Sequence, residues 1–152
     1  MNHMKYDRYT YRGKALSDQH VTVGEWVYGG LFKTKDGCWI VRLAPGEYCD
    51  GIIQHIRVDP ATVGQCTGLP DKNGTAIFAG DVLDDGEIHG GRRRPFEVYW
   101  TDGFGFMISH TTGFSVERPL ENFGQFQTVS HVTQMTVIGN IHDNPELLEV
   151  GV

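Results

Sequence analysis

The chain has 152 residues and a formal net charge of −6, with 39% hydrophobic and 21% charged residues. This composition suits a folded domain with a packed core and excludes wholesale disorder. The acidic balance also argues against a dedicated nucleic-acid-binding domain, which usually carries a basic excess.

The side-chain composition favours β-structure. Val, Ile and Thr together number 35, Ala and Leu only 13, and there are 20 glycines. β-branched side chains pack well on a pleated sheet, and glycine serves tight turns. We therefore expect an all-β fold. A small, strongly bent barrel is favoured over a flat sandwich, because small barrels need glycine kinks and bulges to close.

The first residues lack any period, and Met4 is an alternative start that would make residues 1–3 an extension. No apolar run reaches membrane-spanning length, and no signal segment opens the chain. Cys38, Cys49 and Cys66 are odd in number and form no C-x-x-C, so neither a disulfide framework nor a zinc knuckle is expected. These features predict a cytoplasmic protein with no membrane segment and no cofactor.

From Glu25 the chain reads as short strands joined by tight turns. The first pair of strands is EWVYGGLFK and CWIVRL, joined around Asp36-Gly37, a strong hairpin signal. The next strand, GIIQHIRV, alternates. It places Ile52, Gln54, Ile56 and Val58 on one side, and Ile53, His55 and Arg57 on the other.

The stretch VGQCTGLPDKNGTAIFAGDVL contains the most distinctive turn. It lacks the G-x-x-x-x-G-K-[ST] of a phosphate loop, and the glycine and closing glutamate of a calcium loop are both missing. Pro70, Asp71 and Asn73-Gly74 instead predict a tight turn between a strand ending near Leu69 and one beginning at Ala76.

Two further features follow in the second half. RPFEVYW alternates as a half-buried strand and turns at Thr101-Asp102-Gly103 into FGFMIS. After the strand MTVIGNI, HDNPELL predicts one short helical turn with Asn144 as N-cap and Pro145 at its first position.

Three blocks of this sequence closely resemble the YopX family of phage and prophage proteins. They are RGKALSD with EWVYGGL, TVGQCTGLPDKNGTAIFAGDVL, and VIGNIHDNPELL, in the family's order from about Tyr11 to Leu148. The resemblance implies a mostly β fold with an SH3-like barrel, self-association, and a place in phage or prophage biology. It brings no catalytic residues. Cys66 departs from the family, which usually has an aromatic residue after the Gly-Gln.

We expect one YopX-like domain over residues 1–152. Two subdomains are the alternative, a hairpin region of about residues 1–60 and a barrel of about residues 61–152. Fold analogy does not identify a ligand, because SH3-like barrels host many unrelated functions.

The best candidate binding surface is the loop GGRRRP with the strand that follows it. Arg92, Arg93 and Arg94 can form bidentate bonds with phosphate or carboxylate, and Tyr99 adds a ring on which a base could stack. The competing interpretation is a solvated loop whose arginines pair with nearby Asp and Glu. The net charge of −6 favours that interpretation.

The seven histidines are scattered, without metal-ligand spacing, and no nucleophile elbow is present. His110, His131 and His142 come from separate segments that a barrel could gather, so a metal site stays open as a minor alternative.

The leading hypothesis is a non-enzymatic phage or prophage accessory protein that acts by binding or self-assembly. A homo-oligomer is expected, with a host or phage protein as a further partner. The alternative is a nucleic-acid-binding module that uses the Arg92–Arg94 loop, and the second alternative is an uncatalogued hydrolase or metal enzyme.

Overall fold

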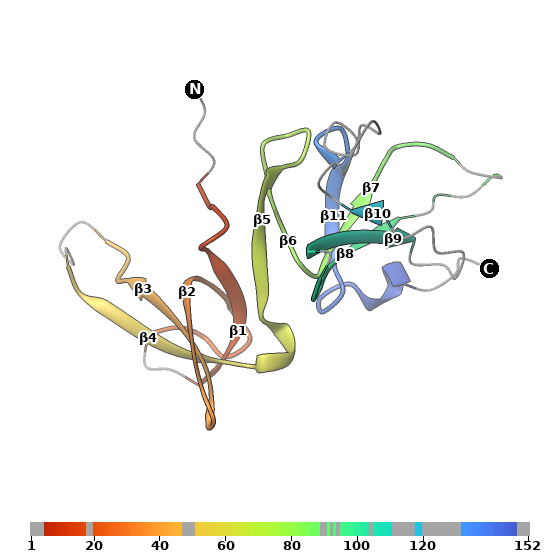
Figure 1. The fold of residues 1–152 in the computed structure, drawn as a ribbon. Helices are drawn as coiled ribbons and strands as arrows, with labels where there is room; N and C mark the ends of the chain where they lie inside the picture. Colours follow the sequence, from red (N-terminus) through yellow and green to blue (C-terminus); the bar gives the residue numbers. More distant parts are fainter. Residues whose placement is uncertain are drawn as a thin grey trace. The chain divides into compact units, whose positions relative to one another are not determined.

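The structure, a computed structural model, is built mainly from antiparallel β-strands, which confirms the predicted fold class (Figure 1). It describes residues 5–17, 20–46, 51–88, 91, 93, 95–103, 105–110, 118–119 and 132–148. The helical segments η1 (Pro60–Thr62) and η2 (Pro145–Leu148) are each a single 3-10 turn.

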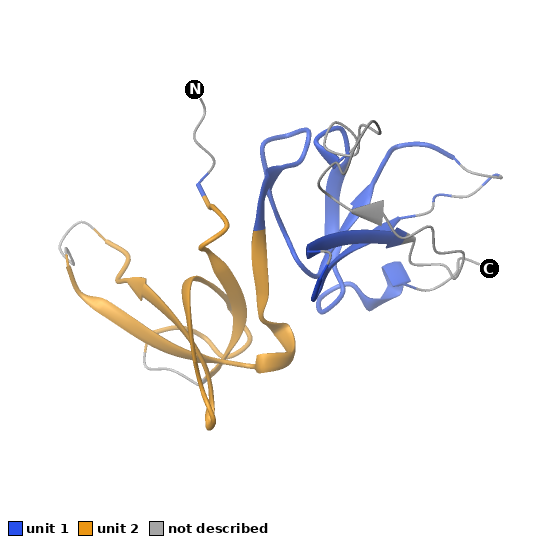
Figure 2. Ribbon diagram, viewed as in Figure 1, with its two compact units in different colours: residues 1–5, 67–152 blue, residues 6–66 orange. Residues whose placement is uncertain are grey.

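The chain divides into two compact units (Figure 2). Unit 2 comprises Tyr6–Cys66, and unit 1 comprises Met1–Lys5 and Thr67–Val152. Each has its own hydrophobic core. The single YopX-like domain and the subdomain limits expected above stay predictions.

Unit 2 contains a sheet whose pairings form a ring. Its strands are β1 (Tyr11–Ser17), β2 (Trp26–Thr34), β3 (Gly37–Leu43), β4 (Ile53–Val58) and the first part of β5 (Gly64–Pro70). β2 pairs with β3, β3 with β4, and β1 pairs with both β4 and β2. This ring closes the sheet into a small barrel. The SH3-like assignment stays a prediction.

The long strand β2 changes partner at Gly29 and Gly30. Residues up to Gly29 pair with β1, whereas Gly30 and the residues after it pair with β3. A Cβ on Gly29 would overlap the carbonyl oxygen of Val41 and lie 3.0 Å from its carbonyl carbon. Only glycine allows the two backbones to approach this closely, and the approach closes the barrel.

The core of unit 2 is formed by alternate residues of its strands. In β4 the side chains of Gln54, Ile56 and Val58 are buried, while Ile53, His55 and Arg57 are exposed, as the sequence alternation predicts. The other buried members of this core are Ala15, Val27, Cys38 and Ile40.

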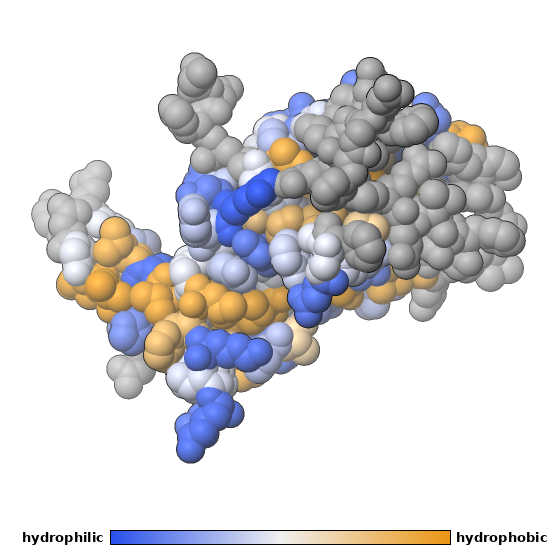
Figure 3. Space-filling model, viewed as in Figure 1, coloured by the Kyte–Doolittle hydropathy of each residue, from blue (hydrophilic) through white to orange (hydrophobic). Residues whose placement is uncertain are grey.

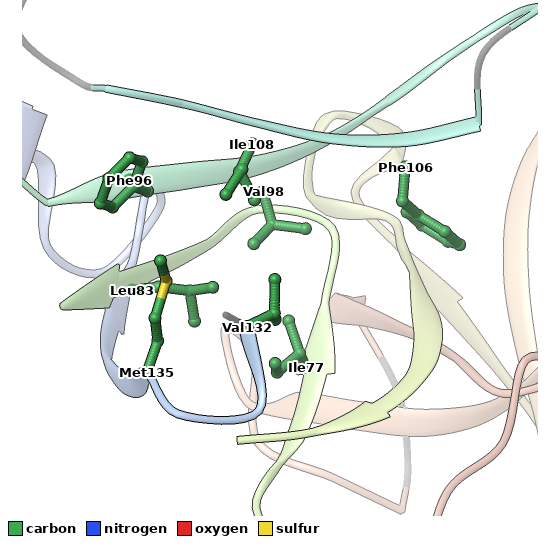
Figure 4. Packing of buried hydrophobic residues seen from close by; sticks show 8 residues of the cluster. All are labelled: Ile77, Leu83, Phe96, Val98, Phe106, Ile108, Val132 and Met135. Atoms are coloured by element: carbon green, nitrogen blue, oxygen red, sulfur yellow. The ribbon is translucent and has the colours of Figure 1, made fainter. Parts of the chain in front are cut away.

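Unit 1 contains a five-stranded antiparallel sheet in the order β10-β9-β8-β7-β11. The strands are β7 (Asp81–Asp84), β8 (Phe96–Thr101), β9 (Gly105–His110), β10 (Arg118–Pro119) and β11 (Thr136–Asn140). Figure 4 shows its core side chains, which come from β6 (Ala76–Phe78), the sheet, and the segment before β11. They are Ile77, Leu83, Phe96, Val98, Phe106, Ile108, Val132 and Met135.

The predicted turn after Pro70 is confirmed. β5 ends at Pro70, β6 begins at Ala76, and Gly74 has a φ of +83°. The carboxylate of Asp71 does more than the sequence predicts. Its Oδ1 accepts hydrogen bonds from the N–H groups of Asn73 and Thr75, both at 2.8 Å, and its Oδ2 accepts one from Val137 of β11 at 3.0 Å. One buried side chain therefore joins the turn to a strand 66 residues away.

Two predicted hairpins and the C-terminal turn are also present. The β2–β3 hairpin turns at Lys35-Asp36, and β8 and β9 pair antiparallel from Phe96 to His110. The 3-10 turn η2 begins at Pro145 as expected. The Oδ1 atom of Asn144 accepts from the N–H of Asn140, so this side chain reaches back along the chain.

Candidate functional site

Of the three arginines in the loop, Arg93 is the one that the structure describes. Its guanidinium forms an ion pair with the Oδ2 of Asp84 at the end of β7. The Asp84 side chain is 9% exposed and that of Arg93 is 68% exposed, so the pair lies at the surface with the carboxylate beneath. Arg92 and Arg94 lie outside the described residues. The arginine that is described thus pairs with an acidic residue, as the competing interpretation expects.

Tyr99 lies in the middle of β8, directly opposite Met107 of β9. The residue is half-buried, and its hydroxyl oxygen is buried. Among the described residues of this hairpin, the exposed ring is that of Trp100, 52% exposed, which meets Phe106 edge-on with 4.9 Å between ring centroids. Arg93 and Tyr99 therefore lie in different environments: Arg93 pairs with the Asp84 carboxylate of β7, and Tyr99 lies in the β8–β9 ladder.

Glu97 lies in the same ladder, opposite Val82 on one side and Ser109 on the other. Burial raises the pKa of the Glu97 carboxyl above its ordinary value of 4.5, because the charged form loses hydration. A single desolvated carboxyl is not a catalytic pair, so this shift alone assigns no reaction.

Within the described ranges, no three His, Cys, Asp or Glu side chains come together in a way that could hold a metal ion. Of the three histidines considered together, only His142 has a described side chain; its backbone N–H donates to the Oδ1 of Asn140. In the same ranges, no helix is long and apolar enough to cross a membrane.

The most distinctive surface is the outer face of β2, β3 and β4 in unit 2. At one end of this face Phe32, Trp39 and Arg57 form a row across the three strands, because Phe32 pairs with Trp39 and Trp39 with Arg57. The two rings are 6.2 Å apart between centroids, and the guanidinium carbon of Arg57 lies 5.8 Å from the centroid of Trp39. The exposed Lys35 adjoins this row at the hairpin turn, whereas Lys33 pairs with the buried Cys38 and so lies on the opposite face of the hairpin. We call Phe32, Trp39, Arg57 and Lys35 the aromatic end.

At the other end of the same face are the aliphatic side chains of Leu43 and Ile53, and Ile52 lies just before β4 begins, next to Ile53 in the chain. Leu43 is 66%, Ile52 55% and Ile53 59% exposed. Leu43 and Ile53 are direct cross-strand partners, and the N–H of Ala44 donates to the carbonyl oxygen of Ile52 at 2.8 Å. We call these three residues the aliphatic end. In Figure 3, hydrophobic residues gather over β3 and β4, and hydrophilic residues gather at the tip of the β2–β3 hairpin.

The two units differ in charge. Residues 6–66 contain seven Lys or Arg and seven Asp or Glu, which cancel, so the whole net charge of −6 belongs to unit 1. The Arg92–Arg94 loop therefore belongs to the acidic unit. The aromatic end has two cations, Arg57 and Lys35, and the nearest acidic residue in the sequence is Asp36, at the hairpin turn between Lys35 and Gly37.

Sequence reasoning did not single out this outer face. The available signal was the two-residue turn at Lys35-Asp36, which places Phe32 opposite Trp39, together with the alternation that sets Ile53 and Arg57 on one side of β4. The sequence does not indicate that the outer face of β2, β3 and β4 has no covering layer in the described part of unit 2.

The family model described as YopX protein matches residues 11–149, which is most of the chain. The chain belongs to the YopX family, as its motifs predict. Among solved structures it is similar to protein EF1440 from Enterococcus faecalis, with 24% identity and a TM-score of 0.43; the match covers 92% of this chain and 97% of that one. No curated protein matches the chain.

Proposed function

We propose that this member of the YopX family is a phage or prophage accessory protein that acts by binding rather than by catalysis, and that its first partner is a second copy of itself. The observation that carries the proposal is the aliphatic end. Large aliphatic side chains scattered singly on a surface need no explanation, but three adjacent ones, each more than half exposed, favour an interaction surface.

The strand that carries Ile53 also offers backbone groups for pairing. In the described residues, β4 pairs with β3 along its whole length, whereas β1 pairs only with its last two residues, Arg57 and Val58. An edge with unpaired N–H and C=O groups can accept a strand of another chain. A two-fold dimer would use the same edge and the same apolar side chains of both copies.

The test is the mass of the protein in solution, measured by light scattering after size exclusion over a range of concentrations. The unmodified protein is expected to exceed the monomer mass of 17.0 kDa. Ile53→Lys together with Leu43→Asp is expected to return it to the monomer, because the charges would have to be desolvated at the contact.

Ile88→Lys is the matched control, since Ile88 is 69% exposed and belongs to unit 1. This substitution should leave the mass unchanged. A monomer at every concentration, or equal behaviour of the two variants, would rule out self-association through the aliphatic end.

A further inference from the structure

The aromatic end differs chemically from the aliphatic end. It combines two rings, Phe32 at 57% exposure and the half-buried Trp39, with the cations Arg57 and Lys35. An aliphatic surface suits a protein partner. Rings beside positive charge suit a ligand that has both flat bases and negative phosphates.

We propose that the aromatic end binds single-stranded nucleic acid. Bases would stack on the exposed face of Phe32 and on the guanidinium plane of Arg57, and the phosphates would lie beside Lys35 and the remaining N–H donors of Arg57. Stacking on aromatic rings and on arginine is tolerant of base identity, so the expected binding is general rather than sequence-specific.

The geometry prepares these groups for such a ligand. Trp39 lies between Phe32 and Arg57 in the strand register and supports both side chains. The Nη2 of Arg57 donates to the backbone carbonyl of Asp36 at 3.1 Å, which orients the guanidinium over the Trp39 ring. A guanidinium has five N–H donors, so this bond leaves the group able to donate to a phosphate as well.

Charge complementarity favours a nucleic acid over a second copy of this chain at the aromatic end. Unit 2 as a whole is neutral, but the aromatic end carries the two cations Arg57 and Lys35. A second aromatic end would bring like charges together. This site is separate from the aliphatic end, so it does not depend on the self-association proposed above.

The experiment measures fluorescence anisotropy of labelled oligothymidylate and oligouridylate against the full-length protein at low salt. Phe32→Ala is expected to weaken binding by tenfold or more, within the roughly 5- to 150-fold that one stacked base contributes. Phe32→Tyr keeps the ring and should restore binding. Trp100→Ala is the matched control, because Trp100 is an equally exposed ring in unit 1.

Salt dependence gives a second readout that does not depend on the rings. Two phosphate contacts, at Arg57 and Lys35, predict a slope of log K against log salt of about −1.4, from about −0.7 per contact on a single strand. The lysine variant Lys35→Gln should reduce the slope to about −0.7, while its control Lys33→Gln, on the opposite face, should leave the slope unchanged. Both lysines are exposed, so both variants are expected to fold normally.

Three results would overturn the proposal. The first is no binding of either oligonucleotide at low salt. The second is binding that Phe32→Ala and the lysine variant leave unchanged. The third is binding that is lost on replacing Arg92, Arg93 and Arg94 by Ala, which would place the site in unit 1. A difference between the DNA and RNA arms would identify which strand is bound.

Discussion

Replacing Asp71 by Ala is expected to destabilise unit 1 by about 3 kcal/mol. The Asp71 carboxylate is 4% exposed and accepts three backbone hydrogen bonds. A hydrogen bond to a charged group contributes about 1.5–3 kcal/mol when its loss leaves a buried partner. We assign about 2 kcal/mol to the long-range bond from Val137 on this basis. The two turn residues, Asn73 and Thr75, are exposed, so water replaces much of their bonds and each loses about 0.5 kcal/mol.

The assay is urea denaturation followed by circular dichroism. Because m is about 1–3 kcal/mol per molar urea, a loss of 3 kcal/mol lowers the midpoint by between about 1 and 3 M. Asp102→Ala is the control: Asp102 is exposed and accepts from the Trp100 indole at 3.1 Å, so its loss should cost well under 1 kcal/mol.

Amide exchange locates the effect within unit 1. The N–H of Val137 should exchange much faster in Asp71→Ala, because its acceptor is gone. If Asp71→Ala shifts the urea midpoint no further than Asp102→Ala, the Asp71 carboxylate does not stabilise unit 1 by joining the turn to β11.

Three further predictions concern residues elsewhere in the fold. Glu97→Gln should be more stable than the parent protein at pH 7, and this advantage should vanish below about pH 4. The pKa of the Glu97 carboxyl is raised in the folded state, so the parent protein loses stability as the pH rises through that pKa. Urea midpoints of both proteins at the two pH values would detect the difference. Gly29→Ala should destabilise the fold by roughly 3 kcal/mol, because the added Cβ would overlap the carbonyl oxygen of Val41 in β3. Gly30→Ala should destabilise it far less, because a Cβ there would lie 3.9 Å from the same oxygen, and equal thermal melting temperatures of the two variants would contradict this reasoning. Arg93→Ala should change stability by less than about 1 kcal/mol, because its pair with Asp84 is largely exposed on the arginine side; a larger loss in a denaturation curve would mean that the loop is a structural element of unit 1.

Local features of the fold could be predicted because their causes are local. The β2–β3 hairpin is predicted from Asp36-Gly37, and its two turn residues are Lys35 and Asp36, one position earlier. The buried face of β4 follows from the alternation of Ile56 and Val58 with His55 and Arg57. Likewise, the tight turn after Pro70 follows from residues that prefer turn conformations.

Features that depend on distant pairings could not be predicted. No local pattern indicates that Asp71 bonds to Val137, since 66 residues separate them. Similarly, β2 pairs with β1 up to Gly29 and with β3 from Gly30 onward. This change of partner is explained by the closed ring of strands, which no local pattern indicates. The candidate surface was missed for the same reason: alternation gives two faces of a strand, but whether Phe32 and Ile53 are covered depends on the rest of the sheet.

The measurement that tests self-association most directly is hydrogen–deuterium exchange of the unmodified protein at low and high concentration. Self-association through this edge predicts that the backbone N–H groups of β4, from Ile53 to Ile56, exchange more slowly in the concentrated sample, while those of β8 are unchanged. Equal exchange of β4 at both concentrations, or protection confined to unit 1, would contradict it.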